Sequence, residues 1–369
     1  MRLLNLGASE GTLCGARDYA TLLAGELSRL GHDIETQWLQ RPLPPGSARN
    51  RLKVALAPAR EGRFDAVLWH YSVFTYSHRG VPSMVWPYAM ALRAIPVPVV
   101  TVLHELVYPW GHKGLTGTLW ASSQRMALPA VVGVSAGLVV TVEERASWLQ
   151  SRPYLPRRPV VTSPVFSNLP EVTVSRRLNG DIRIGMFGYP GSSAKLVAAA
   201  LSRILGGGQP AELLLLGSPG PGSPAAAEWE SAGACSGTTG ALRFSGVLPP
   251  EQLASEMAGC DMLLFHDGDG PVSRKGTLAA ALASGRPLVA VDGPHTWPAL
   301  VAERAVRLVP PDAELLAAAL IDLAGDARSR EALGARGRSF YDRNQGIGVV
   351  ASSIAAFIEE LTSRCADAR

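Results

Sequence analysis

Residues 2–39 read RLLNLGASEGTLCGARDYATLLAGELSRLGHDIETQWL, and this stretch indicates the fold class. It begins with a short apolar run, residues 2–6, and ends with a second one, residues 33–39. Between the two runs, Gly31 follows large apolar side chains that recur at helical spacing: Tyr19, Leu22, Leu23, Leu27 and Leu30. A strand, a helix and a second strand in this order predict a βαβ unit with parallel strands.

The same alternation of short apolar runs and helical segments continues along most of the chain. Further strands are expected at residues 65–69, 97–103 and 138–142, and a second series at 182–187, 212–216, 242–245, 261–265, 288–291 and 306–309. Alternating strands and helices predict an α/β protein with parallel sheets covered on both faces.

Two domains are expected, because 369 residues suffice for two hydrophobic cores. A proline- and arginine-rich stretch at 151–170, followed by polar residues 175–181, predicts a linker between them. We therefore expect one Rossmann-like domain at 1–170 and another at 171–348. The glycines of Gly346-Ile347-Gly348 interrupt a helical region, so the last helix, within 349–369, is expected to pack back on the first domain. Residues 217–240, rich in small residues and proline, predict an extended surface loop with one short helix.

The composition, 47% hydrophobic and 18% charged, indicates a packed globular protein. No uninterrupted apolar stretch approaches the roughly 20 residues that span a bilayer, and the first residues lack a signal-peptide pattern. A cytoplasmic location is the expectation. The four cysteines contain no Cys-x-x-Cys pair, which argues against a zinc site and against a disulfide framework.

The net charge of +4 is unevenly distributed. Residues 1–174 contain 17 Lys and Arg against 11 Asp and Glu, whereas residues 175–369 contain 18 against 20. A basic first half favours an anionic acceptor or peripheral contact with the inner face of a membrane, and ordinary scatter over a solvated surface is the alternative. The balance gives no reason to expect a nucleic-acid partner.

A glycine-rich loop follows the first expected strand, and Gly7, Gly11 and Gly15 lie four residues apart. This spacing matches neither the G-x-G-x-x-G dinucleotide fingerprint nor the Walker pattern, which disfavours a dehydrogenase. Glycines before a helix let a backbone approach a phosphate, although an ordinary tight turn explains them equally well.

Two single residues are further candidates. His104, with Glu105, comes directly after an expected strand, and ligands of open α/β sheets gather at the carboxyl ends of strands. Lys195 lies seven residues after Gly188, in the first turn of an expected helix, where a cation opposes the helix dipole. A bound anion would remove this conflict; a solvent-exposed lysine is the alternative.

The strongest local pattern is Ser273-Arg274-Lys275-Gly276-Thr277, between an expected strand and an expected helix. Two cations, two hydroxyls and the N–H groups of a helix start suit a diphosphate. The alternative is a helix N-cap by Ser273 with two solvated charges. Asp267 and Asp269, just before this pattern, suggest a D-x-D metal motif, but without further ligands a solvated turn is preferred.

In their order along the chain, these segments resemble the family 4 glycosyltransferases, whose GT-B fold has two Rossmann-like domains with parallel sheets facing across a cleft. Residues 14–19 resemble the family's first glycine loop, and residues 99–105 its strand ending in His-Glu or His-Asp. Residues 188–195 match its phosphate-binding Gly…Lys spacing. Residues 244–248 resemble its base-contacting turn, and residues 279–290 its EAMAxGxPVVA segment.

The chain departs from the family pattern in three places. Val272 and Ala280 stand where the family usually has two glutamates eight residues apart, and Tyr189 stands where it often has arginine. The turn from Ser273 to Thr277 resembles the S-x-R-[RK]-G-[ST] loop of some members. The missing second carboxylate leaves the recognition of the ribose unassigned.

The resemblance implies a hexosyl transfer with retention from a UDP- or GDP-sugar, which is a substrate, with no cofactor and no metal. Lys195, Arg274 and Lys275 would stabilise the leaving diphosphate, and His104 would bind the donor sugar or place the acceptor hydroxyl. The remaining donor contacts are expected from Gly15, Gly188, Gly217, Val247, Ser273, Gly276 and Thr277. We expect Lys195 and the Ser273–Thr277 turn to converge on one pyrophosphate.

Two other functions stay open: a binding or partner protein that has lost catalysis, and a sugar-nucleotide epimerase. The acceptor, whether natural product, glycan or lipid-linked sugar, and the oligomeric state are not predicted. Six residues after the strand expected at 65–69 are candidates to line an acceptor pocket: His70, Tyr71, Phe74, Tyr76, His78 and Arg79. The alternative is that the aromatic residues among them only pack against the rest of the protein.

Overall fold

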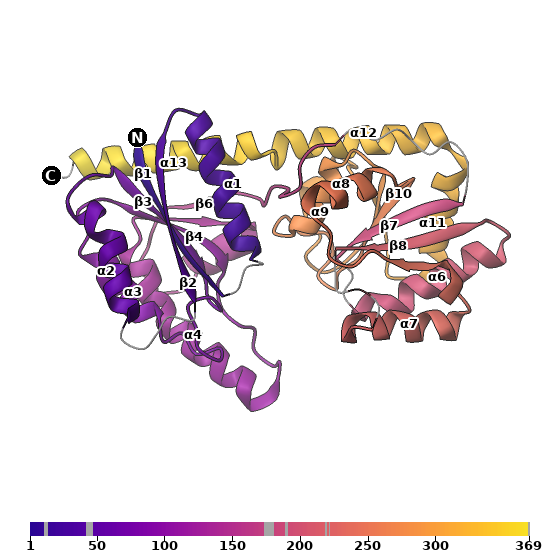
Figure 1. Ribbon diagram of the computed structural model, residues 1–369, viewed down its shortest axis with the longest axis horizontal. Coiled ribbons are helices and arrows are strands. Elements are labelled where there is room, and N and C mark those ends of the chain that lie inside the picture. The colour runs from indigo at the N-terminus through magenta and orange to yellow at the C-terminus, as the bar shows by residue number, and fades with distance from the viewer. Residues whose placement is uncertain are drawn as a thin grey trace. The chain divides into compact units, whose positions relative to one another are not determined.

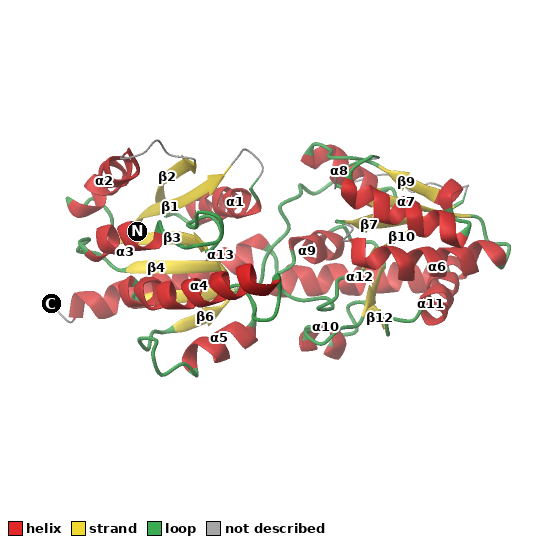
Figure 2. Ribbon diagram, turned by 90° about the horizontal axis from the view of Figure 1, so that it is seen from below, coloured by secondary structure: helices red, strands yellow, loops and turns green. Residues whose placement is uncertain are grey.

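A computed structural model describes residues 1–10, 14–41, 47–172, 181–188, 191–217, 220 and 222–367. The chain divides into two compact units. Unit 1 consists of Met1–Pro164 with Ile347–Arg369, and unit 2 consists of Val165–Gly346. Figures 1 and 2 show that helices enclose the strands of each unit. The predicted α/β class with parallel sheets is confirmed.

The sheet of unit 1 has six parallel strands in the order β2-β1-β3-β4-β5-β6. The strands are β1 (Arg2–Glu10), β2 (Asp33–Arg41), β3 (Ala66–Ser72), β4 (Val99–Glu105), β5 (Gly137–Val140) and β6 (Val160–Thr162). Five of them lie where the apolar runs predict strands. The sixth, β6, lies inside the expected linker at 151–170, because a three-residue strand between prolines is too short for its pattern to stand out.

The helices of unit 1 form two layers, one on each face of its sheet. They are α1 (Gly15–Arg29), α2 (Ser47–Arg60), α3 (Val85–Arg93), α4 (Gly114–Val134), α5 (Glu143–Gln150) and α13 (Ile347–Asp367). In the sheet, β2 lies on one side of β1, whereas β3, β4, β5 and β6 follow one another on the other side. The connection from β1 to β2 therefore runs in the opposite direction to the connections from β3 to β6. Right-handed crossovers therefore place α1 on one face and α2, α3 and α4 on the other, as Figure 1 shows.

The last helix, α13, packs on α1 and belongs to unit 1. Its Phe357 and Leu361 fill the space that a side chain at Gly137 would need. The stretch Ala327–Cys365 contains a window apolar enough for a membrane span, but the apolar side chains of α13 are those of a core helix. Fully buried among them are Val350, Ala351, Ile354 and Ile358.

Unit 2 repeats the architecture with the strand order β12-β11-β10-β7-β8-β9, again parallel. Its strands are β7 (Ile182–Phe187), β8 (Ala211–Leu216), β9 (Leu242–Phe244), β10 (Met262–Phe265), β11 (Leu288–Val291) and β12 (Arg307–Val309). Its α-helices are α6 (Ala194–Gly206), α7 (Pro224–Ser236), α8 (Pro250–Ala258), α9 (Gly276–Ala283), α10 (Pro298–Ala302), α11 (Ala313–Gly325) and α12 (Ala327–Asn344).

The helix α7 corrects the expectation of a loop with one short helix at 217–240. It has 13 residues, and its Trp229 is fully buried in the core of unit 2. Ser223 caps its N-terminus by accepting a hydrogen bond from the N–H of Ala226 at 3.1 Å, and Pro224 occupies the first helical position. This Ser-Pro start is the sequence signal that predicts the helix.

Candidate functional site

The carboxyl ends of the strands of unit 2 bring several predicted site residues to one edge of its sheet. Strand β7 lies between β10 and β8, so the segments that follow these three strands are neighbours. Gly188 follows β7 and donates its N–H to the carbonyl of Leu216 at the end of β8, at 3.1 Å. Ser193, just before α6, is buried, and its hydroxyl donates to the carbonyl of His266 after β10, at 3.4 Å.

Gly188 also lies against the turn that follows β10. A Cβ atom on Gly188 would lie 3.0 Å from the Cγ2 methyl of Thr277, which is tighter than almost all real Cβ contacts. The φ angle of Gly188 is +66°, in the left-handed region that favours glycine. Gly188, Gly276 and Thr277 therefore lie together, as a shared phosphate site requires.

Arg274 and Lys275 each form an ion pair with an aspartate of the same loop. Lys275 Nζ lies 2.6 Å from the carboxylate of Asp267, and an Arg274 guanidinium nitrogen lies 2.5 Å from that of Asp269. This corrects the expectation of a solvated Asp267-Gly268-Asp269 turn: both carboxylates are partners of the predicted cations. Within the described residues, no three His, Cys, Asp or Glu side chains are placed to hold a metal.

The carboxylate of Asp267 is ionised at neutral pH. Burial opposes its ionisation, but hydrogen bonds from Lys275 and from the N–H of Asp269 outweigh burial and lower its pKa. Because two cations face two carboxylates, the loop at 267–275 carries no net charge.

Backbone hydrogen bonds fix the loop at 267–275. The carbonyls of Asp269, Pro271 and Ser273 each accept one at 2.9 Å; the donors are the N–H groups of His295, Trp297 and Val165. Ser273 is buried, and the N-cap of α9 is Lys275, without a side-chain cap. The alternative of a Ser273 cap is therefore wrong, and the first N–H groups of α9 have no intrahelical acceptor.

Lys195 lies in the first turn of α6, two residues after Ser193, and its side chain is exposed. It forms no ion pair with any residue that the structure describes. The contact between Ser193 and His266 places the start of α6 beside the end of β10, from which the Arg274–Lys275 loop departs. Lys195 is thus an uncompensated cation near a loop whose own charges cancel.

Gly217 and Val247, two further donor-binding candidates, flank the next strand ends. Gly217 follows β8 with a φ of +71°, and its N–H donates to the Ser245 hydroxyl at 3.2 Å. A side chain on Gly217 would collide with Phe187 at 2.6 Å. Val247, after β9, is 63% exposed, so its side chain is accessible to a ligand.

In unit 1, His104 is the last but one residue of β4 and lies beside His70 of the neighbouring strand β3. His70 Nδ1 and His104 Nε2 lie 3.1 Å apart, within hydrogen-bond distance, and the two rings stack. Arg145 donates to the main-chain carbonyl of His104 at 2.7 Å, which fixes this end of the strand.

Both imidazoles are neutral at physiological pH. Burial lowers the pKa of His104 to about 4, with a further contribution from the Arg145 charge. Burial, and then the neighbouring His104, hold the pKa of His70 well below its ordinary value. His70 is 2% exposed, and its Nε2 has no hydrogen-bond partner among the described residues.

No family model matches the chain, and no curated protein matches its sequence. Solved structures do match. Sucrose-phosphate synthase from Thermosynechococcus elongatus is 15% identical, with a TM-score of 0.68 over 99% of this chain and 100% of that one. The chain has the GT-B fold. HepE from Anabaena, in complex with UDP and glucose, is 14% identical with a TM-score of 0.65 over 98% of this chain and 100% of that one.

A third GT-B neighbour is the UDP-GlcNAc 2-epimerase from Neisseria meningitidis, bound to UDP-GlcNAc. It is 11% identical, with a TM-score of 0.59 over 98% of this chain and 100% of that one. These identities establish the GT-B fold alone. Membership of family 4 stays a prediction.

Several residues that were predicted to line the acceptor pocket or to bind the donor lie elsewhere in the structure. Tyr71 and Tyr76 do not line a pocket, because both are fully buried beside Trp69, whose indole N–H donates to the Tyr76 hydroxyl at 2.9 Å. Phe74, His78 and Arg79 are exposed on the following loop. Gly15 is the first residue of α1 rather than part of a loop, and an added side chain there would meet nothing within 4 Å.

Two residues that pack against the histidine pair, Tyr19 and Trp38, were not predicted as site residues. Tyr19 of α1 and Trp38 of β2 pack edge-on or tilted against these rings, with centroids 5.2 Å (Tyr19 to His104) and 6.1 Å (Trp38 to His70) apart. The Trp38 indole N–H donates to the Ser9 hydroxyl at 2.9 Å. Tyr19 lies on a helix and Trp38 lies near the end of a strand, and neither position distinguishes the residue from a core residue.

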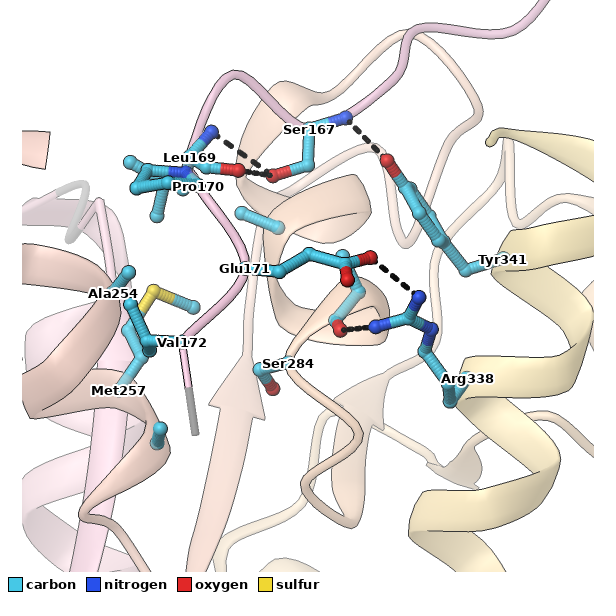
Figure 3. A pocket seen from close by; sticks show the side chains of 13 residues that line it. Ser167, Leu169, Pro170, Glu171, Val172, Ala254, Met257, Ser284, Arg338 and Tyr341 are labelled. Atoms are coloured by element: carbon cyan, nitrogen blue, oxygen red, sulfur yellow. Dashed lines mark hydrogen bonds and ion pairs between the residues drawn. The ribbon is translucent and has the colours of Figure 1, made fainter. Parts of the chain in front are cut away.

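A cavity of about 400 Å³ in unit 2 is lined by none of the predicted site residues. Figure 3 shows the side chains that line it. Its walls come from residues 167–172 and from α8, α9 and α12, and they include the C-terminal rather than the N-terminal end of α9. Arg338 of α12 is paired there with Glu171 at 2.5 Å. The cavity therefore belongs to the packing of the 167–172 segment and not to the candidate phosphate site.

Proposed function

We propose that this chain is a glycosyltransferase that moves a sugar from a nucleoside-diphosphate sugar to an acceptor hydroxyl. The observation that carries the proposal is the loop at 267–277, where Arg274 and Lys275 are fixed at the start of α9 beside Gly188. Two GT-B neighbours support it: sucrose-phosphate synthase, and HepE, which was solved with UDP and glucose.

Most N–H donors of Lys275 and Arg274 are available to bind a diphosphate. An ammonium has three N–H groups and a guanidinium five, so the contacts with Asp267 and Asp269 leave most donors of Lys275 and Arg274 open to a ligand. The first N–H groups of α9 add partial positive charge. Lys195 supplies the net charge that the neutral loop lacks. We assign to these groups the binding of the two phosphates.

The same groups lower the barrier to transfer. When the bond between the anomeric carbon and the diphosphate oxygen breaks, that oxygen keeps the electron pair and gains negative charge. Cations and N–H groups that are already in place bind this charge more tightly than the ground state. We infer that no metal is needed and that the anomeric configuration is retained, as the resemblance to family 4 implies.

We assign the acceptor hydroxyl or the donor sugar to the histidine pair of unit 1. A neutral imidazole can both donate and accept a hydrogen bond, which suits a hydroxyl. His70 Nε2 is buried and has no partner among the described residues; leaving such a nitrogen unpartnered costs about 1–3 kcal/mol, which a hydroxyl within reach would recover.

Thermal unfolding of the full chain with UDP and with GDP tests the donor site. A ligand that binds only the folded state at 100 times its Kd stabilises it by about 2.7 kcal/mol, which raises the Tm by several degrees. Lys275→Ala should abolish the rise. The matched control is Arg307→Ala, which removes a cation that is 57% exposed and lies 3.9 Å from Asp322. This variant should show the same rise in Tm as the wild type. No rise with either nucleotide, or an equal rise in Lys275→Ala, contradicts the proposal.

Turnover separates the proposal from its alternatives. Incubation with a panel of sugar nucleotides and hydroxyl acceptors should release nucleoside diphosphate only when an acceptor is present. The epimerase among the GT-B neighbours makes epimerisation the second candidate, and it requires an altered sugar without any acceptor. Nucleotide binding with no product of either kind indicates a binding protein.

A further inference from the structure

Three neighbouring helices of unit 1 lack acidic residues. Helices α2, α3 and α4 cover one face of its sheet side by side, and they have 14, 9 and 21 residues without a single Asp or Glu. Their exposed cations are Arg51, Lys53, Arg60 and Arg93. Lys113, also exposed, precedes α4, and Arg125 lies within it.

Apolar side chains project outward from the same layer. On α4, Leu115 is 91% exposed, Leu119 57% and Met126 74%, at spacings of four and seven residues that place them on one side of the helix. On α3, Trp86 is 52% exposed and Met90 66%. A surface helix normally turns polar residues to the solvent, and the exposed apolar side chains of α3 and α4 depart from this pattern.

Two aromatic rings, Trp110 in the loop before α4 and Trp120 within α4, each lie against a cation. Trp110 is 52% exposed, and the guanidinium of Arg125 lies 4.7 Å from the centre of its ring. Lys113 Nζ lies 5.2 Å from the ring centre of Trp120. Side chains with an apolar body and a charged or polar tip are typical of the boundary between membrane and water.

We propose that this surface docks on an anionic lipid bilayer. We call it the basic apolar face, and it consists of the exposed cations and the exposed apolar residues of α2, α3, α4 and the loop before α4. The apolar residues enter the boundary between headgroups and acyl chains, and the cations contact lipid phosphates. Each cation near such a surface strengthens binding about fivefold.

A second copy of the chain is a poorer occupant of the basic apolar face. A symmetric dimer places the same patch on both sides of its interface, so it would bring cations against cations with no carboxylate on α2, α3 or α4 to compensate them. Only a negatively charged partner complements the face, and an anionic bilayer also accepts its apolar side chains. Docking requires no turnover and is independent of the proposed transfer.

Co-sedimentation of the full chain with lipid vesicles tests docking. The wild type should bind vesicles of phosphatidylcholine and phosphatidylglycerol in equal parts, bind vesicles of phosphatidylcholine alone at least tenfold more weakly, and lose affinity as salt rises. Arg51→Glu with Lys53→Glu, and separately Leu115→Ser with Leu119→Ser, should each lower binding about tenfold or more. All four side chains are exposed, and far-ultraviolet circular dichroism verifies that the variants fold.

Leu315→Ser with Ile321→Ser is the matched control, because these two residues of α11 in unit 2 are 51% and 40% exposed. This variant should bind vesicles like the wild type. Docking on lipid is refuted if the wild type does not bind anionic vesicles, or if the variants of the basic apolar face bind them equally well. A dimer in analytical ultracentrifugation that Leu115→Ser with Leu119→Ser dissociates, without vesicle binding, would assign the face to a second copy instead.

Discussion

Replacing Asp267 with asparagine should tighten the binding of a nucleoside diphosphate, because the Asp267 carboxylate competes with the ligand for Lys275. The carboxylate lies 2.6 Å from Lys275 Nζ, and both side chains are 24% exposed. Its pKa is lowered despite burial, through the hydrogen bond from Lys275, so the competing charge is present at neutral pH. Asparagine keeps an oxygen for the N–H of Asp269, and it replaces the charged oxygen to which Lys275 donates with an uncharged NH2 group.

The magnitude follows from this geometry. A phosphate oxygen bound to Nζ opposite the carboxylate lies about 5 Å from it, and the repulsion of two unit charges at that distance is about 1–3 kcal/mol for dielectric constants between ~80 and ~20. Removing the repulsion should lower the Kd about 5- to 100-fold. Losing the partner that orients Lys275 offsets about 0.5–1 kcal/mol of this gain.

Titration calorimetry with UDP or GDP, whichever raises the Tm of the wild type, measures the effect. Asp269→Asn should give a smaller gain, because Asp269 is 42% exposed and its repulsion is screened. Asp322→Asn removes an exposed carboxylate elsewhere in unit 2 and should leave the Kd unchanged. A Kd that rises in Asp267→Asn would show that the carboxylate positions Lys275 rather than competing for it.

Three further predictions concern stability and the site. Gly188→Ala and Gly222→Ala should each cost about 1–2 kcal/mol in unfolding free energy, since both glycines have positive φ. Only Gly188→Ala should also weaken nucleotide binding in calorimetry, because its methyl group meets Thr277 whereas Gly222 faces open space. Below pH 6.5 the unfolded chain protonates His104 and the folded chain, with a pKa of about 4, does not. His104 should therefore contribute a fall in stability of up to about 1.4 kcal/mol per pH unit between pH 6.5 and 4 in urea unfolding, and the fall should be less steep by this amount in His104→Asn. Trp229→Ala should destabilise unit 2 by about 3–5 kcal/mol in thermal unfolding, since it empties a fully buried position.

The sequence predicts most strands because each is a local apolar run with clear borders. Strands β7 and β11 have the predicted bounds, 182–187 and 288–291, and the others differ by a few residues. The order of strands within a sheet is not local information. That β7 lies between β10 and β8 decides which loops meet, and only the structure shows it.

The sequence identifies residues of the candidate site, but it does not predict the contacts between them. The sequence identifies Arg274 and Lys275 by their position before a helix, yet it does not show that Asp267 and Asp269 neutralise them. The pairing of His70 with His104 joins residues 34 positions apart, on neighbouring strands. A propensity or a spacing cannot reveal such a pair, because it follows from the register of β3 and β4.

The return of the chain to unit 1 at α13 has a consequence for synthesis on the ribosome. Unit 1 lacks its last helix until the 182 residues from Val165 to Gly346 have been translated, which takes about 10–40 s. During that time the groove above α1 and Gly137 that Phe357 and Leu361 will occupy is uncovered. Unit 2, which is continuous in sequence, can finish folding first, so the earlier half of the polypeptide completes its fold later.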